Sequence, residues 1–236
     1  MGVAVGPVSG IHDATFAACL VLDFDGTILD TEEPLYRSWA ELWDDHGHQL
    51  SLTDWQQNIG TVDSFDPWAQ LEHRLGRPLD PGVADRRRRR RDDLQSHNGT
   101  RPGVRSWLAE ADRLGVPVGI ASSSPIDWVE EHLERLGLRE QFGCVVCVDH
   151  RIPAKPEPTS YLEACRHLAS DPSRSVAVED SPNGVAAAVG AGLFTVAVPN
   201  RLTVGLDLSA ADVVADSLDQ LTLLETLGSA SLRLER

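Results

Sequence analysis

The sequence has few of the features that would place the chain on nucleic acid or in a membrane. Lys and Arg number 21 against 36 Asp and Glu, and the net charge of −15 argues against an anionic partner surface. No apolar run is long enough to span a bilayer. Residues 1–16 lack a basic start and a long apolar segment, so we expect a loose tail there rather than a signal peptide.

Cysteine is also scarce, with four residues in the chain. Cys19 and the pair Cys144 and Cys147 lie in apolar, strand-like runs, which indicates buried free thiols. The pair has the spacing of a redox or zinc site, but no second pair of ligands accompanies it. Reduced thiols are typical of the cytoplasm, which is the expected location. The sequence has no clear oligomerisation signal, and a monomer is expected.

The most informative stretch runs from Leu22 to Asp30. An uncharged apolar run, 17–22, leads into it, as expected of a parallel strand buried on both faces. Asp23 and Asp25 leave such a strand on the same side, and Gly26 allows a sharp turn after them. Two adjacent carboxylates repel each other unless a cation lies between them or one is protonated. The pattern therefore predicts a divalent ion with oxygen ligands, and Mg²⁺ is the expected one.

Two parts of the chain differ in their hydrophobic pattern. Between about Thr31 and Thr100 only helical periodicity is present, whereas from Arg101 onward helices alternate with short apolar strands. Strands are expected at 116–121, 144–148, 175–178, 194–198 and 212–214, and helices at 104–114, 156–168 and 182–189. This order predicts an α/β fold with a doubly wound parallel sheet, whose functional site lies beyond the carboxyl ends of the strands.

Polar residues gather at those predicted strand ends. They are Asp23 and Asp25 after the first strand, Ser122 after the second, Lys155 a short loop beyond the third, and Glu179 and Asp180 after the fourth. Polar residues scattered at random over the surface would not be expected at the same sheet edge after four different strands. We therefore expect these side chains to form one site.

The same residues carry a resemblance to a known family. The segment Asp23–Asp30, DFDGTILD, resembles in full the first motif of the haloacid dehalogenase-like (HAD) superfamily, and the likeness covers about residues 18–36 and 101–200. Ser122, Lys155 and the segment Val178–Gly184 match its second, lysine and acidic motifs. The resemblance implies a HAD-like Rossmannoid core at 17–32 and 101–236, with a small all-helical cap domain inserted at 33–100.

The resemblance and the needs of phosphoryl transfer together imply roles for the acidic residues. Asp23 is the expected nucleophile, forming an aspartyl-phosphate, and Asp25 the general acid and base. Asp23, the main-chain carbonyl of Asp25, and Asp180 are expected to hold Mg²⁺, with Glu179 nearby through water.

Other residues are expected to contact the substrate. Ser122 and Lys155 would hold the phosphoryl oxygens, with backbone N–H groups near Gly26 and Thr27 as further donors. The candidates for substrate specificity are Asn58, Gly60, Thr61, Asp63 and Ser123.

The cap region has two unusual compositional features. Arg86–Arg91 are six consecutive arginines, which suggest either a phosphate- or nucleic-acid-binding patch or a helix with solvated charged faces. Six consecutive helical residues point all round the axis, so the second interpretation is favoured, with one or two arginines within reach of a substrate. Four of the six tryptophans also lie there, and a role in the cap's own core is favoured over sugar stacking.

Within the superfamily, the chain most resembles the β-phosphoglucomutase-like branch, which includes mutases and sugar or polyol phosphatases. In the mutases a cap arginine holds a second phosphate, but here Gly60 is followed by Thr61, Val62 and Asp63. Leu35 also stands at about the place of a histidine found in the mutases. Both departures favour a substrate with one phosphate, and the expected activity is a Mg²⁺-dependent phosphatase acting on a small phosphorylated metabolite.

Three alternatives stay open. One is the phosphosugar mutase. Another is a metal-free 2-haloacid dehalogenase, which is disfavoured because Asp25 and Asp180 are both present. The third is a non-catalytic metabolite-binding protein, which is disfavoured because no expected catalytic position is lost.

Overall fold

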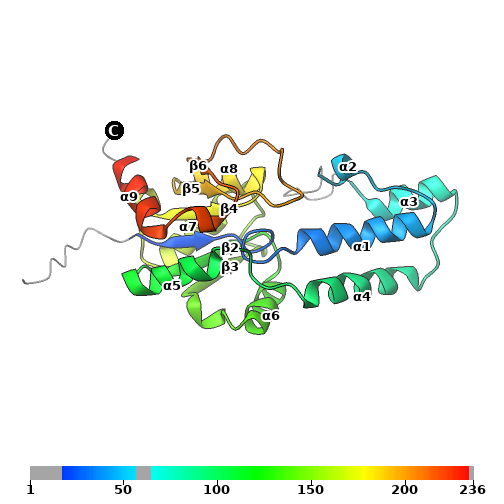
Figure 1. The fold of residues 1–236 in the computed structure, drawn as a ribbon, viewed down its shortest axis with the longest axis horizontal. Coiled ribbons are helices and arrows are strands. Elements are labelled where there is room, and N and C mark those ends of the chain that lie inside the picture. Colours follow the sequence, from blue (N-terminus) through cyan, green and yellow to red (C-terminus); the bar gives the residue numbers. More distant parts are fainter. Residues whose placement is uncertain (1–17, 57–64, 234–236) are drawn as a thin grey trace, which may run out of the picture.

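The computed structural model describes residues 18–56 and 65–233 (Figure 1). Within these residues one sheet of six parallel strands has the order β3-β2-β1-β4-β5-β6. The strands are β1 (Leu20–Leu22), β2 (Val118–Ser122), β3 (Cys144–Cys147), β4 (Val176–Glu179), β5 (Phe194–Ala197) and β6 (Val213–Val214). The predicted α/β class and doubly wound parallel sheet are confirmed.

Helices cover both faces of the sheet because alternate strand residues point to opposite sides. They are α5 (Val104–Leu114), α6 (Ile126–Leu136), α7 (Thr159–His167), α8 (Pro182–Gly190) and α9 (Leu223–Arg233). Leu20 and Leu22 pack with residues of α5, α6 and α9, whereas Val21 packs with residues of α7 and α8. The helix α9 is absent from the sequence predictions, although Leu223, Leu227 and Ala230 follow a helical spacing.

The register of the sheet brings the expected site residues to one edge. Leu22 pairs with Ile120 of β2 on one side and with Val178 of β4 on the other. The residues that follow these positions therefore leave the sheet at nearly the same level. This places Asp23 beside Glu179, although the two are far apart in the sequence.

Among the described residues, four of the five helices between β1 and β2 lie beyond the carboxyl ends of the strands, away from the sheet (Figure 1). They are α1 (Glu32–Asp45), α2 (Leu52–Gln56), α3 (Pro67–Leu75) and α4 (Val83–Ser96). They share an apolar cluster in which Trp43 and Trp55 are buried and Trp39 and Trp68 partly buried, as expected of tryptophans that form the cap's own core. The cluster also includes Leu202, from the segment after β5, and the division into a core and a cap stays a prediction.

The arginine run lies on α4 and divides by helix face. Arg86, Arg88 and Arg89 are exposed, as expected for a solvated helix. Arg87 instead lies over the Trp39 ring, 4.5 Å from its centroid, and Arg90 donates to Glu41 of α1 at 2.7 Å. Arg87 and Arg90 therefore join α4 to α1.

Several predicted boundaries differ from the structure. The helix α7 begins at Thr159 rather than Pro156, because Pro158 disfavours helical backbone at the residue before it. The spacing of Leu52 and Trp55 predicts one apolar helix face, but Leu52 is 37% exposed whereas Trp55 is buried. Residues 1–16 and the specificity candidates Asn58, Gly60, Thr61 and Asp63 lie outside the described residues. Among the helices that are described, none is long and apolar enough to cross a membrane.

Candidate active site

Four charged side chains are buried together where the central strands end. Asp23 directly follows β1, Glu179 ends β4, Asp180 comes next, and Lys155 lies in the loop between β3 and α7. Their exposed fractions are 6% for Asp23, 8% for Lys155, 0% for Glu179 and 3% for Asp180. Charges are rarely buried to this extent unless they are paired or bind an ion. The gathering predicted from the strand ends is therefore present.

Lys155 provides the positive charge at the centre of this group. It is the only lysine in the sequence, and its Nζ lies 2.5 Å from Oδ1 of Asp23 and 2.5 Å from Oε1 of Glu179. Tyr161 donates its hydroxyl to the same Glu179 oxygen at 2.6 Å, and the backbone N–H of Asp180 donates to the other oxygen at 3.1 Å. Glu179 is thus fully hydrogen-bonded and fixes the direction of the Lys155 side chain.

Burial changes the proton affinities of these groups. It raises the pKa of Asp23 to about 8, although the charge of Lys155 acts in the opposite direction. Burial also raises the pKa of Asp180 well above its ordinary value, and the charges of Asp23 and Glu179 add to this effect. For Lys155 burial acts to lower the pKa, but Asp23 and Glu179 outweigh it and raise the pKa. Burial and mutual repulsion therefore disfavour three ionised carboxylates beside a single ammonium group unless further positive charge binds.

The acidic residues fit a divalent metal ion. Asp23, Glu179 and Asp180 each offer a carboxylate oxygen, and these oxygens lie within 4.8 Å of one another. Oδ2 of Asp23 is buried and has no hydrogen-bond partner among the described residues. Carboxylate oxygens are the ligands that hard divalent cations prefer. An ion bound here would satisfy the orphaned oxygen and offset the excess negative charge.

Asn200 and Arg101 support the metal candidates, and neither is among the site residues expected from the sequence. Asn200 is buried after β5 and donates to Oδ2 of Asp180 at 2.7 Å. Its position at the end of a strand is the signal that identified the other site residues. Arg101 donates to the carbonyl oxygens of Gly26, Val198 and Pro199, and so joins the loops after β1 and β5. Its long-range contacts leave no local pattern in the sequence.

Gly26 lies where the chain leaves the site. Its φ is +84°, and a Cβ atom there would overlap the carboxylate of Asp180 and the amide of Asn200. Both the backbone conformation and the lack of space therefore require glycine.

Asp25 lies outside the acidic cluster, and its carboxylate has its own donors. Oδ1 accepts hydrogen bonds from Thr31 at 2.7 Å and from Nε1 of Trp128 at 3.0 Å. Oδ2 accepts one from the hydroxyl of Ser124 at 2.6 Å. Asp23 and Asp25 thus have different hydrogen-bond partners, although the charge of Asp25 still contributes to the raised pKa of Asp23. The three donors to Asp25 were missed because they come from separate segments.

The other expected phosphate ligands lie at the same sheet edge. Ser122 is buried, and its Oγ accepts a hydrogen bond from the backbone N–H of Ser124 at 3.0 Å. Thr27 is also buried, and its Oγ1 has no partner among the described residues. Ser123 is exposed and accepts a hydrogen bond from the backbone N–H of Lys155. Their roles with a substrate stay predictions.

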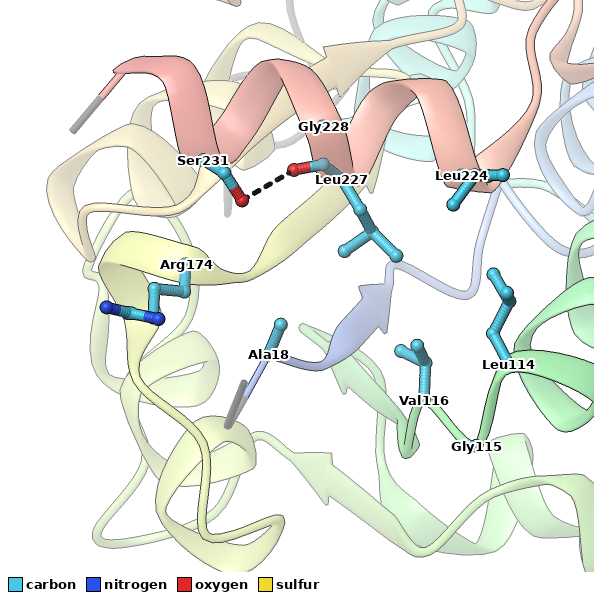
Figure 2. Close-up of a pocket in the computed structure, with 9 residues that line it drawn as sticks. All are labelled: Ala18, Leu114, Gly115, Val116, Arg174, Leu224, Leu227, Gly228 and Ser231. Carbon is cyan, nitrogen blue, oxygen red and sulfur yellow. Dashed lines mark hydrogen bonds between the residues drawn. The ribbon is translucent and has the colours of Figure 1, made fainter. Parts of the chain in front are cut away.

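A hollow lies at the end of the sheet opposite these residues (Figure 2). It has a volume of about 460 Å³ and lies between α9 and the segments that precede β1, β2 and β4. The lining is mainly apolar, with Leu114, Val116, Leu224 and Leu227 among its residues, and none of the described residues that line it carries a carboxylate or an imidazole. This hollow therefore lacks the groups needed for hydrolytic chemistry, which are concentrated at the carboxyl edge.

Comparison with known proteins places this geometry in a family. A model of haloacid dehalogenase-like hydrolases matches residues 17–192. YhcW of Bacillus subtilis is 38% identical over 205 residues, covering 86% of this chain and 93% of that protein. The N-acetylmuramic acid 6-phosphate phosphatase of Pseudomonas aeruginosa is 32% identical over 184 residues, covering 76% of this chain and 80% of that protein.

A solved structure agrees in fold. CbbY from Rhodobacter sphaeroides in complex with phosphate is 28% identical, with a TM-score of 0.69 over 89% of this chain and 98% of that one. The family match covers Asp23, Ser122, Lys155 and Asp180, which are the residues that the sheet gathers. The chain belongs to the haloacid dehalogenase-like hydrolases and is similar, within that family, to proteins named as phosphatases.

Proposed function

We propose that the protein is a Mg²⁺-dependent phosphatase that hydrolyses a small phosphorylated metabolite, such as a sugar or polyol phosphate, through an aspartyl-phosphate. The observation that carries this proposal is the buried contact of Asp23 with Lys155 beside Asp180. Phosphoryl transfer requires a positioned nucleophile and positive charge near the phosphoryl oxygens, which Asp23, Lys155 and a metal ion held by the carboxylates would provide. The relative named for N-acetylmuramic acid 6-phosphate supports a sugar phosphate as substrate.

Asp23 and Asp25 would divide the chemistry between them. In the first step an Asp23 oxygen attacks phosphorus, the bond from phosphorus to the alcohol oxygen breaks, and Asp25 gives that oxygen its proton. In the second step Asp25 takes a proton from a water molecule. The resulting hydroxide attacks phosphorus, which releases inorganic phosphate and restores Asp23.

Positive groups would hold the phosphoryl oxygens during both steps. Lys155 and Ser122 bind these oxygens, and the contact of Lys155 with Glu179 keeps its ammonium in place. The Mg²⁺ ion would be held by Asp23, Asp180 and the main-chain carbonyl of Asp25, with Glu179 nearby through water. When bound, it supplies positive charge that offsets the phosphoryl and carboxylate charges.

The alternatives receive less support from the described residues. A metal-free dehalogenase does not require a buried Asp180 next to the nucleophile, whereas a metal-dependent phosphatase does. Leu35, at about the place of the mutase histidine, packs against the apolar cluster of the cap. We also propose a cytoplasmic location, because all four cysteines are free thiols. The monomer stays a prediction.

Phosphate release from a panel of sugar, polyol and aryl phosphates, with and without Mg²⁺, tests the proposal. We expect release from at least one of them, its loss in EDTA and its recovery with added Mg²⁺. Asp23→Asn serves as the control for contaminating phosphatases and should be inactive. Phosphate release that is unchanged in Asp23→Asn, or no release from any compound, would overturn the proposal. Chloride release from a 2-haloacid that survives EDTA would favour the dehalogenase.

A further inference from the structure

We propose that Trp128 is a positioning residue for Asp25, and that Arg91 of the cap braces Trp128 in that role. The inference rests on the proposed function, in which Asp25 protonates the leaving alcohol. It assigns a function to one arginine of the α4 run that solvation alone does not explain, and to a tryptophan that lies outside the cap.

Asp25 accepts hydrogen bonds from donors of two kinds, two hydroxyl groups and one indole N–H. Thr31 and Ser124 are hydroxyl donors whose protons can rotate toward other acceptors. Nε1 of Trp128, at 3.0 Å from Oδ1 of Asp25, can only donate, and its direction is fixed by the indole plane. The indole therefore sets the orientation of the Asp25 carboxylate more strictly than either hydroxyl does.

The Trp128 ring is itself held by neighbours. The ring of His132, one helical turn further along α6, has its centroid 4.1 Å from that of Trp128. Nδ1 of His132 lies 2.8 Å from the backbone carbonyl of Trp128, so this nitrogen donates and His132 is fixed in turn. His132 is only 7% exposed. The core thus provides a rigid support for the indole.

Arg91 reaches the same ring from the cap. The central carbon of its guanidinium lies 5.3 Å from the Trp128 ring centroid, within the range of a cation–π contact. Its side chain is 25% exposed, whereas that of Arg88 in the same run is 62% exposed. Asp92 accepts hydrogen bonds from Arg91 and directs the guanidinium. The cap therefore contacts the indole that orients the general acid.

Substrates with different leaving groups can show whether Trp128 positions Asp25 or only packs in the fold. An alkyl alcohol leaves only when it is protonated, whereas 4-nitrophenolate leaves without help from an acid. The parameter kcat/KM reports the steps up to departure of the alcohol. A misplaced Asp25 should therefore lower kcat/KM for an alkyl phosphate and spare the aryl phosphate, while general loosening of the fold would lower both.

The first experiment compares Trp128→Phe with the wild type on a sugar phosphate that it hydrolyses and on 4-nitrophenyl phosphate. Phenylalanine keeps a ring for His132 and Arg91 but removes the indole N–H. General acids contribute roughly 10²- to 10⁴-fold, so we expect a loss of about tenfold or more on the sugar phosphate and under about threefold on the aryl phosphate. Trp107→Phe is the matched control, because its indole donates to the Leu221 carbonyl away from the site. It should leave the ratio of the two rates unchanged.

The second experiment tests the brace. Arg91→Gln should change the same ratio in the same direction by a smaller factor, about two- to fivefold, because the indole N–H remains. Arg89→Gln removes the same charge from an exposed position of the same helix and should have no effect on the ratio.

The outcomes distinguish this inference from the proposed function. Equal losses on both substrates in Trp128→Phe, or an unchanged rate on the sugar phosphate, would overturn the role of Trp128. If the ratio of kcat/KM on the sugar phosphate to kcat/KM on the aryl phosphate is the same in Arg91→Gln and Arg89→Gln, the proposed role of Arg91 is wrong. If Asp25→Asn itself loses equally on both substrates, Asp25 is not the general acid and the proposed function fails at that residue.

Discussion

The ammonium nitrogen of Lys155 lies 2.5 Å from Oδ1 of Asp23, and both side chains are more than nine-tenths buried. The two groups come from loops after different strands, and parallel pairing of the sheet brings them together. Because Asp23 and Lys155 are the expected nucleophile and phosphate ligand, this ion pair couples the stability of the core to its chemistry.

Removing the buried cation should destabilise the protein. In Lys155→Met the carboxylates of Asp23 and Glu179 lose their shared partner, and the free energy of unfolding should fall by about 3–5 kcal/mol. Tyr161→Phe, which removes one hydroxyl donor to Glu179, should cost less, about 1.5–3 kcal/mol. Urea unfolding in EDTA measures both. Adding Asp23→Asn to Lys155→Met should restore part of the loss; a further drop would contradict the pairing.

Asn200 should control metal affinity without being a ligand. Its side-chain amide orients Asp180 through the 2.7 Å hydrogen bond. Removing such a support typically costs about 10- to 100-fold in metal affinity, so Asn200→Ala should need correspondingly more Mg²⁺ for half-maximal activity. Titration of phosphatase activity with Mg²⁺ measures this, and a melting curve shows whether the variant is folded. An unchanged Mg²⁺ requirement in a folded variant would refute the role.

Alanine variants of two glycines can distinguish the cost of backbone strain from the cost of a steric clash. Gly26 and Gly47 both have positive φ, +84° and +75°, but only at Gly26 would a Cβ meet other atoms. Gly47→Ala should therefore cost only the strain of placing alanine at positive φ, about 1–2 kcal/mol. Gly26→Ala should cost more and should also weaken Mg²⁺ binding, since the methyl group displaces Asp180. Equal losses of stability in the two variants, measured by urea unfolding, would contradict this account.

Glu32 gives a prediction for pH dependence. Burial, followed by the charges of Asp25 and Asp30, raises its pKa from 4.5 to about 7. Because the pKa of Glu32 is higher in the folded state than in the unfolded state, its contribution to stability is fully present below pH 4.5. This contribution is lost as the pH rises through about 7. Glu32→Gln cannot ionise, so its stability relative to the wild type should increase by up to about 3 kcal/mol between pH 5 and pH 8.

Melting temperatures in EDTA at the two pH values check this prediction. Glu131→Gln, at an exposed position of α6, is the control and should follow the wild type at both values. A difference between Glu32→Gln and the wild type that does not change with pH would contradict it.

Local patterns were enough to predict much of this site. The apolar run before Asp23, the spacing of Asp23 and Asp25, and the polar residues after each strand are all visible within short windows of sequence. Parallel strands have their carboxyl ends at one edge, so an α/β pattern implied that these residues would meet. The same rule would have identified Asn200 after β5. Boundaries near prolines, as at the start of α7, were placed less well.

The sequence by itself determined the fold class, the site's edge and the residues that carry charge there, because strand order and local spacing control them. Only the tertiary structure decided which partners each charge has: Lys155 between Asp23 and Glu179, and Trp128 on Asp25. These contacts join segments separated by 24 to 132 residues, and Trp128 lies 103 residues from Asp25. Short-range periodicity contains no information on such pairs, because they form only when helices and strands pack against one another.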